Sequence, residues 1–348
     1  MLVETDGNLL DDFRSYIQDG YYLAVMPIAR VHIDALSAKR YPHGVTFYFP
    51  GLVDLKQLGI VPNDRDSKWH TEQVAALSGI DEEVLNRHPL VVFPYRFRWD
   101  EFRSTTNFRG HLEFIRTLSN HVDRTCLNVV RYCQCPIGVF DTLPGNAGTI
   151  NSNHMMAGAL LFNPEIHESR IIGGAVFTHI ITLGLGLSIE SVDNKHYPKQ
   201  GEVGFIAEHA LTLYKSLLEA SDPTSCFIQA LSLLEFLAFP DEYKKFVEVK
   251  KVIARYVAKD PSEYQRLLDR FFELTGKMDK KTGYIIGYRT RMVHLGERLE
   301  DIVQDPDDRK GLFLELEKYI KAALDHMIEH SAMDFEDYLG VREKLHPF

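Results

Sequence analysis

The sequence predicts an α+β protein with a mixed α/β domain over residues 1–200 and a helical bundle over residues 201–348. Three observations support this prediction. Short runs rich in Val, Ile, Tyr and Phe, bounded by Gly or Pro, are confined to the first region. Amphipathic segments of helical length fill the second region. A polar stretch containing a proline, Val192–Glu202, separates the two, and a chain of 348 residues is long enough for two domains.

The first region is expected to combine strands with helices. Four runs dominated by β-branched and aromatic residues are expected strands: Tyr21–Ile33, Val45–Gly51, Pro89–Phe97 and Ala157–Phe162. A short helix is expected at Asn8–Gln18 and a long one at His111–Tyr132. The apolar segment Ile171–Ile189 is about long enough to cross a bilayer. Its glycines, its threonines and His179 instead favour a buried element or a pair of strands.

The second region is expected to form a bundle of roughly five or six helices. Its helical segments are, in order, Glu202–Glu219, Thr224–Phe239, Glu242–Ala258, Ser262–Thr275, Thr282–Val303 and Arg309–His330. The sequence also marks helix ends. Asp260 is an expected N-cap, Pro261 suits a first helical turn, and Gly276 closes that helix.

Composition and cysteine count indicate a cytoplasmic protein. The chain starts without the basic segment and apolar core of a secretory signal. Its four cysteines are too few for a disulfide scaffold in 348 residues. Cys126, Cys133 and Cys135 lack the recurring spacing of a structural zinc site. No glutamate accompanies His326 and His330 as it would in a metalloprotease motif, so we expect both histidines at the surface. We therefore expect no metal, no cofactor and no membrane span.

The net charge of −10 is unevenly distributed. Residues 241–300 hold 14 Lys and Arg against 10 Asp and Glu, whereas the remainder holds 25 against 39. This pattern argues against a general nucleic-acid coat protein, but the locally basic lobe can still present one site to a phosphodiester. Leu143–Gly148 ("LPGNAG") has too few glycines for the phosphate loop of an NTPase.

The helix expected at Thr282–Val303 has an apolar stripe and a second, mixed face. The stripe predicted to face the core consists of Ile285, Tyr288, Met292, Leu295, Leu299 and Ile302. Because each residue turns a helix by about 100°, Arg289 and His294 fall on either side of this stripe. The outward face between them holds Thr290 and Glu297 together with the aliphatic Ile286 and Val293. An apolar patch bordered by Arg and His favours a surface covered by a second molecule over an ordinary solvated face.

An arginine followed five positions later by a histidine is not by itself informative. The pattern occurs at Arg65–His70, Arg116–His121 and Arg289–His294. The first pair lies in a loop-like run, and the second lies on the expected long helix and remains a competitor. Only the third pair lies in a helical bundle, in a region where Lys and Arg outnumber Asp and Glu.

The segments "ALSLLEFLAF" and "YIIGYRTRMVHLGE" together resemble HEPN domains, most closely the Apea-like group. In that family an apolar helix containing an acid precedes a helix with an Arg, a few intervening residues and a His, often followed by Gly or an acid. The resemblance covers roughly residues 203–330. The matching residues are Glu235, Arg289, His294, Gly296 and Glu297. Active members often carry Asn, Asp or His directly after the Arg, where this chain has Thr290.

The resemblance implies a metal-independent RNA endonuclease that acts as a homodimer, with the motif helices of two copies side by side. RNA supplies the nucleophile, its 2′-hydroxyl. His294 would exchange a proton with that hydroxyl or with the leaving 5′-oxygen, and Arg289 would stabilise charge on the phosphate. The expected substrate-binding residues are Arg291, Thr290 and Glu235, and the expected interface residues are Ile286, Val293 and Glu297. Single-stranded or loop RNA is the expected substrate, in a stress or anti-phage defence system.

Other interpretations remain open at this point. The bundle could be a non-catalytic HEPN module that dimerises and binds nucleotide, RNA or another protein. The presence of Thr290 directly after the arginine favours this interpretation. Arg289 and His294 could be ordinary surface residues. Glu235 could hold a bundle Arg or Lys, since a buried acid needs a partner. An enzymatic centre within residues 1–200 has no recognised motif behind it.

Overall fold

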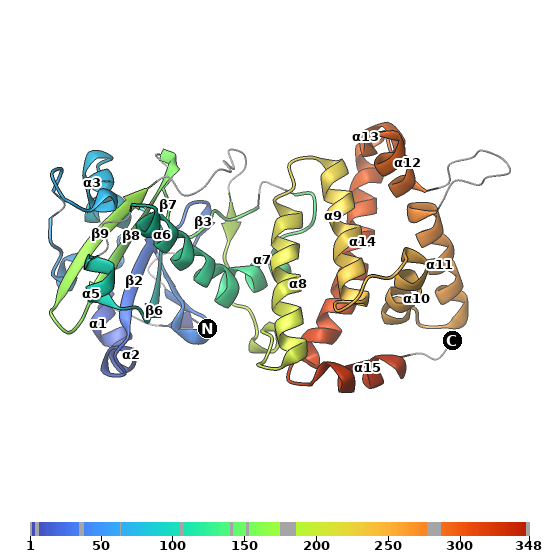
Figure 1. The fold of residues 1–348 in the computed structure, drawn as a ribbon, viewed down its shortest axis with the longest axis horizontal. Helices are drawn as coiled ribbons and strands as arrows, with labels where there is room; N and C mark the ends of the chain where they lie inside the picture. Colours follow the sequence, from blue (N-terminus) through green and yellow to red (C-terminus); the bar gives the residue numbers. More distant parts are fainter. Residues whose placement is uncertain are drawn as a thin grey trace. The chain divides into compact units, whose positions relative to one another are not determined.

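The computed structural model describes residues 2–3, 7–34, 38–62, 64–104, 108–139, 142–150, 153–174, 186–276 and 287–345. The chain forms two compact units, Met1–Cys133 with Phe140–Val192, and Gln134–Val139 with Asp193–Phe348. The first unit contains an antiparallel sheet with helices, and the second is helical (Figure 1). The predicted α+β class is therefore confirmed. The short segment Gln134–Val139, which the sequence assigned to the first domain, belongs to the helical unit.

The first unit is built on one antiparallel sheet. Its order is β1-β4-β5-β6-β2-β8-β7, with β9 also paired to β8. In that order the strands are β1 (Leu2–Val3), β4 (Ala38–Arg40), β5 (Thr46–Tyr48), β6 (Leu90–Tyr95), β2 (Tyr22–Pro27), β8 (Asn153–Asn163) and β7 (Thr149–Ile150), with β9 at Glu168–Gly174. A small parallel pair joins β3 (Val31–His32) to β10 (Leu187–Ser188). All four runs predicted as strands coincide with strands: the first contains β2 and β3, the second β5 and the third β6, and the fourth lies within β8. Residues 175–185 of the apolar segment lie outside the described residues.

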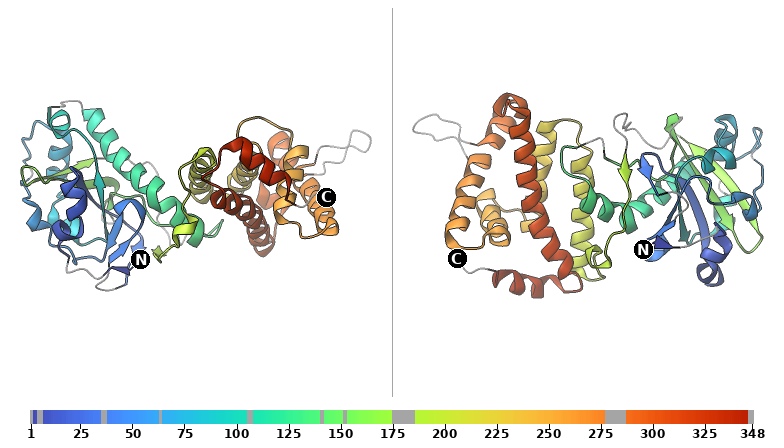
Figure 2. Two further views of the ribbon diagram at one scale, coloured as in Figure 1. Left: turned by 90° about the horizontal axis from the view of Figure 1, so that it is seen from below. Right: turned by 180° about the vertical axis from the view of Figure 1, so that it is seen from behind.

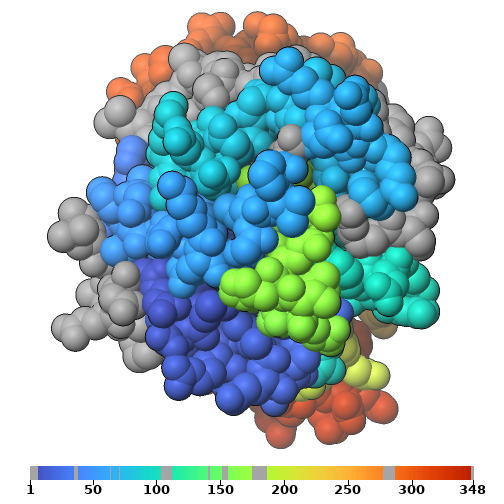
Figure 3. Space-filling model, turned by 90° about the vertical axis from the view of Figure 1, so that its left-hand side faces the viewer, coloured from blue at the N-terminus to red at the C-terminus, as the bar shows by residue number. Residues whose placement is uncertain are grey.

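Both faces of this sheet are covered by helices. One face buries Leu23, Val25 and Val92 against short helical segments: α1 (Leu9–Asp12), η2 (Leu55–Leu58), α3 (His70–Leu77) and α4 (Glu82–Asn86). Gly173 lets α3 lie close to β9, because an added Cβ would meet the Cα of Ala75 on α3 at 3.3 Å. Figure 3 shows the green β8–β9 hairpin beside the dark-blue segment of α1 and α2 (Arg14–Gln18) and the light-blue segment of η2 and α3.

The opposite face carries the long helix predicted at His111–Tyr132, but its hydrogen bonding changes along its length. It consists of α6 (Phe108–Val122), a π-helix (Asp123–Leu127) and α7 (Asn128–Gln134). α6 packs against β8 and β9 (Figure 2). A buried ion pair joins Arg131 Nη1 to Asp123 Oδ1 at 2.7 Å, so the π-helix is tied to the helix that follows it. The remaining short helices of this unit are α5 (Trp99–Ser104) and η1 (Pro42–Gly44).

The second unit is a helical bundle. Its helices include α8 (Glu202–Leu218), α9 (Pro223–Ala238), α10 (Phe246–Val257), α11 (Pro261–Thr275), α14 (Pro306–Glu329) and α15 (Phe335–Glu343), after the short η4 (Asn194–His196). α8, α9 and α14 lie side by side, and α10 packs against α9, α11 and α14 (Figure 1). The predicted cap is confirmed, since the Asp260 side chain accepts from the backbone N–H of Glu263 and Pro261 opens α11. α15 was not predicted.

The prediction of one continuous helix over Thr282–Val303 is wrong. Residues 277–286 lie outside the described residues, and the described part forms α12 (Tyr288–Leu295) and α13 (Leu299–Ile302). Gly296 ends α12 in the left-handed conformation, with φ of 70°, which glycine adopts without the steric cost that other residues meet. The apolar periodicity continues through this turn, which is why the sequence pattern concealed the break.

None of the helices formed by the described residues combines the length and the apolar character that a membrane span requires.

Candidate functional site

The segment that carries the predicted motif, α12, is held at the edge of the bundle. It packs against α11 and α13. Met292 is buried, and the ring of Tyr288 lies 6.3 Å from the ring of Phe227 on α9. These two residues therefore face the bundle as predicted, and the remaining side chains of α12 are left to form a partly exposed surface.

Arg289 is anchored by an acid from a distant part of the sequence. Its Nη1 lies 2.7 Å from Oε1 of Glu235, with 34% of the arginine side chain and 24% of the glutamate side chain exposed. The guanidinium also lies 5.8 Å from the ring centre of Phe246 at the start of α10. Since a guanidinium has five N–H donors, this anchoring fixes the arginine and leaves donors for a further anion.

The two residues after Arg289 have partners within the same unit. The Thr290 hydroxyl donates to the carbonyl of Gly276, which ties α12 to the end of α11. Arg291 forms an ion pair with Glu297 across the Gly296 turn. The hydrogen bond to Glu297 is the main reason that the pKa of Arg291 is raised. Arg291 and Glu297, predicted at the substrate and the dimer interface, are thus joined to each other.

The end of α12 exposes His294 between two aliphatic residues. Val293 is 56% exposed and Leu295 is 53% exposed. The prediction that Leu295 faces the core is wrong, because α12 stops at Gly296 and no element covers this side of its last turn among the residues described. The described part of the chain supplies no hydrogen-bond partner to the His294 ring, so both ring nitrogens can meet another molecule. Ile286, the third residue predicted on this face, lies outside the described residues.

Arg289 and His294 leave the helix in different directions. Five residues correspond to about 140° of helical rotation, and the two side chains differ in environment, since one is anchored to Glu235 and the other is exposed. A single α12 therefore does not focus both groups on one atom. A ligand that contacts both must pass around the end of the helix or lie between two copies of it.

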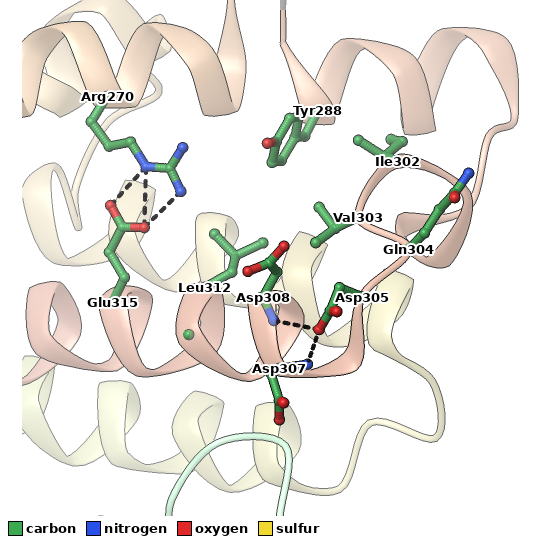
Figure 4. Close-up of a pocket in the computed structure, with 11 residues that line it drawn as sticks. Arg270, Tyr288, Ile302, Val303, Gln304, Asp305, Asp307, Asp308, Leu312 and Glu315 are labelled. Atoms are coloured by element: carbon green, nitrogen blue, oxygen red, sulfur yellow. Dashed lines mark hydrogen bonds and ion pairs between the residues drawn. The ribbon is translucent and has the colours of Figure 1, made fainter.

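A cavity of about 610 Å³ lies beside α12 and has an acidic lining (Figure 4). Tyr288, Ile302, Val303 and Leu312 contribute its aromatic and aliphatic surface. Its carboxylates are those of Asp305, Asp307, Asp308 and Glu315. The carboxylate of Glu315 is paired with the guanidinium of Arg270, with Nε–Oε1 at 2.9 Å and Nη2–Oε2 at 2.8 Å. Because carboxylates repel phosphate, this cavity does not suit a phosphodiester.

The second Arg-x-x-x-x-His pair lies in the sheet unit on α6. Arg116 is exposed, whereas His121 is half-buried against the rings of Phe93 and Tyr95, at 5.4 and 5.1 Å. Burial lowers the pKa of His121, and the nearby charges of His43 and Arg124 lower it further. The proximity of His43 could not be predicted, because this residue is distant in the sequence.

The prediction that His326 and His330 form a surface pair is wrong. Both are half-buried, their rings stack at 4.4 Å, and Nδ1 of His326 lies 3.1 Å from the hydroxyl of Tyr338. Burial lowers the pKa of His326 to about 4. This cluster holds α15 against α14. Within the described ranges no group of three or more His, Cys, Asp or Glu is arranged to hold a metal ion.

Comparisons with protein-family models, curated proteins and solved structures gave no match to this chain.

Proposed function

We propose that the helical unit is a metal-independent RNA endonuclease that acts as a homodimer through α12 in the cytoplasm. The observation that carries this proposal is the exposed His294, flanked by the exposed aliphatic residues Val293 and Leu295 on the same short helix as the anchored Arg289. An isolated histidine on a surface is common, but a histidine between two exposed aliphatic residues, on the same short helix as a fixed guanidinium, suits an interface where phosphate is bound.

The proposed reaction uses the 2′-hydroxyl of RNA as nucleophile. His294 of one copy takes the proton of this hydroxyl as its oxygen attacks the adjacent phosphorus. The bond from phosphorus to the 5′-oxygen then breaks, and that oxygen receives a proton from the second imidazole of the dimer or from water. The products are a 2′,3′-cyclic phosphate and a 5′-hydroxyl, and the reaction needs no metal.

Arg289 would act on the phosphate rather than on the proton. A phosphate in transfer carries charge on its non-bridging oxygens, which a guanidinium stabilises through paired N–H groups. Glu235 would position the guanidinium, since it already holds Nη1 at 2.7 Å. Arg291 and Thr290 would support the substrate only through donors or lone pairs not used in their contacts with Glu297 and Gly276.

Dimerisation would bring two sites together. Because Arg289 and His294 diverge on one helix, two α12 helices packed side by side through Val293 would place the arginine of one copy nearer the histidine of the other. Single-stranded or loop RNA would be the substrate, because its backbone can bend into such a cleft. A role in stress or anti-phage defence rests on the HEPN resemblance alone.

The second candidate function is a non-catalytic module that dimerises and binds RNA, nucleotide or a protein. The specific observation in its favour is that Arg289, Thr290 and Arg291 all have partners within the same chain. In this case the three residues stabilise the end of the bundle, and only Val293, His294 and Leu295 contact a second molecule.

A cleavage assay separates these candidates. Purified protein is incubated with labelled RNA in EDTA, beside His294→Ala and Arg289→Ala. Matched controls are His209→Ala on α8 and Arg266→Ala on α11, which remove an exposed His and an exposed Arg elsewhere in the unit. Cleavage by wild type and both controls, but by neither site variant, supports the nuclease. Absence of cleavage by a folded, dimeric wild type across varied RNAs favours the binding module.

A further inference from the structure

A π-helix in the sheet unit brings three basic side chains together. His121 lies two residues before the start of the π-helix Asp123–Leu127, and Arg124 lies within it. The η1 turn, which contains His43, packs against the same π-helix and against β6. π-helices are rare, and they occur frequently at functional sites because the extra residue redirects side chains.

The backbone of His43 adopts an unusual conformation. Its φ is 59°, in the left-handed region that glycine and asparagine occupy most easily and that costs other residues about 1 kcal/mol or more. A turn of this kind does not require a histidine. The His43 and Arg124 side chains are both exposed.

An aromatic surface lies next to these basic groups. The His121 ring lies 5.1 Å from Tyr95, the Tyr95 ring lies 6.3 Å from Phe114, and Phe114 lies 5.0 Å from Phe97. Tyr95, Phe97 and Phe114 are all partly exposed. Partly exposed rings adjoining cations are the combination on which proteins stack bases while holding the phosphate.

We propose that His43, His121 and Arg124, together with Tyr95 and Phe114, bind a nucleotide unit, either as a free nucleotide or within single-stranded RNA. Arg124 and the histidines would donate to the phosphate, and the Tyr95 and Phe114 rings would receive the base. Burial is the main cause of the lowered pKa of His121, and the nearby charges of His43 and Arg124 lower it further. The positive potential of these two groups is one that a bound phosphate would offset. The site lies within the sheet unit and does not depend on nuclease activity of α12.

The test measures binding by full-length protein with three probes: inorganic phosphate, AMP and a short 2′-O-methyl oligouridylate, which cannot be cleaved through its 2′-oxygen. Calorimetry is performed on wild type, His43→Ala, Arg124→Ala and Phe114→Leu. The control Arg14→Ala removes an exposed arginine from α2. Far-UV circular dichroism and thermal unfolding establish that each variant is folded.

We expect AMP or the oligonucleotide to bind more tightly than phosphate. The Kd should rise about tenfold or more in His43→Ala and Arg124→Ala and stay unchanged in Arg14→Ala, as loss of a charged hydrogen bond predicts. Equal affinity for AMP and the oligonucleotide identifies a free nucleotide, and binding of the oligonucleotide alone identifies RNA. Three results would overturn the proposal: no probe binds, phosphate binds as tightly as AMP, or the variants bind like wild type.

Discussion

The contact between Glu235 and Arg289 gives a prediction whose size follows from its geometry. The two side chains are 2.7 Å apart, with 24% and 34% of their surfaces exposed. Fully exposed ion pairs contribute about 0.2–1 kcal/mol, whereas breaking a fully buried pair costs about 3–5 kcal/mol. A part-buried pair lies nearer the exposed limit, so we expect a coupling free energy of about 1 kcal/mol, roughly fivefold in the unfolding equilibrium.

A double-mutant cycle measures this coupling directly. Glu235→Gln, Arg289→Gln and the double variant remove one or both charges. Urea unfolding of the helical unit is followed by far-UV circular dichroism at low salt and again at high salt, where screening should reduce the coupling only in part. A coupling below about 0.3 kcal/mol, within the error of additivity, would show that the pair is not formed and would refute our account of how Arg289 is positioned.

Three further predictions concern the rest of the helical unit. Val293→Asp should convert the proposed dimer to a monomer in light scattering, whereas Leu77→Asp, at another exposed apolar position, should not. A dimeric Val293→Asp would show that α12 does not form the interface. The folded-state pKa of His326 is lowered to about 4 from 6.5, so the unfolded state binds more protons between these two values. The contribution of neutral His326 to the free energy of unfolding is therefore complete above pH 6.5 and is lost as the pH falls toward 4. Each pKa unit corresponds to about 1.36 kcal/mol, and after discounting for partial exposure we expect the free energy of unfolding in urea to fall by about 1–2 kcal/mol. His326→Gln should abolish this pH dependence. An unchanged pH profile in that variant would exclude His326 as the cause. Asp260→Ala should cost about 1 kcal/mol through loss of the α11 cap, and an unaltered urea midpoint would contradict that role.

Much of the fold was predictable because local chemistry sets it. Asp260 followed by Pro261 specifies the start of α11 whatever its neighbours. The β-branched and aromatic run at Leu90–Tyr95 forms a central strand because it is apolar on both faces. The break at Gly296 was missed, since apolar spacing continues across it and only the backbone reveals the left-handed turn.

The candidate site was only partly predictable, for a physical reason. The sequence identified an acid in an apolar helix and an arginine on a later one, and the bundle brings Glu235 and Arg289 together. It could not show that Leu295 is exposed, because exposure depends on where α12 ends. The approach of His43 to His121 depends on how η1 packs against the π-helix, and no local pattern encodes that contact.

The proposed function depends above all on His294 drawing a proton from the 2′-hydroxyl of RNA. The most direct test compares an RNA with its counterpart carrying a single 2′-deoxynucleotide on the 5′ side of the cleaved bond, both in EDTA, with products separated by their 3′ ends. We expect a 2′,3′-cyclic phosphate from the RNA, no cleavage at the deoxy position, and a rate at least about 100-fold lower with His294→Ala. Cleavage at the deoxy position, or full activity of His294→Ala, would contradict it.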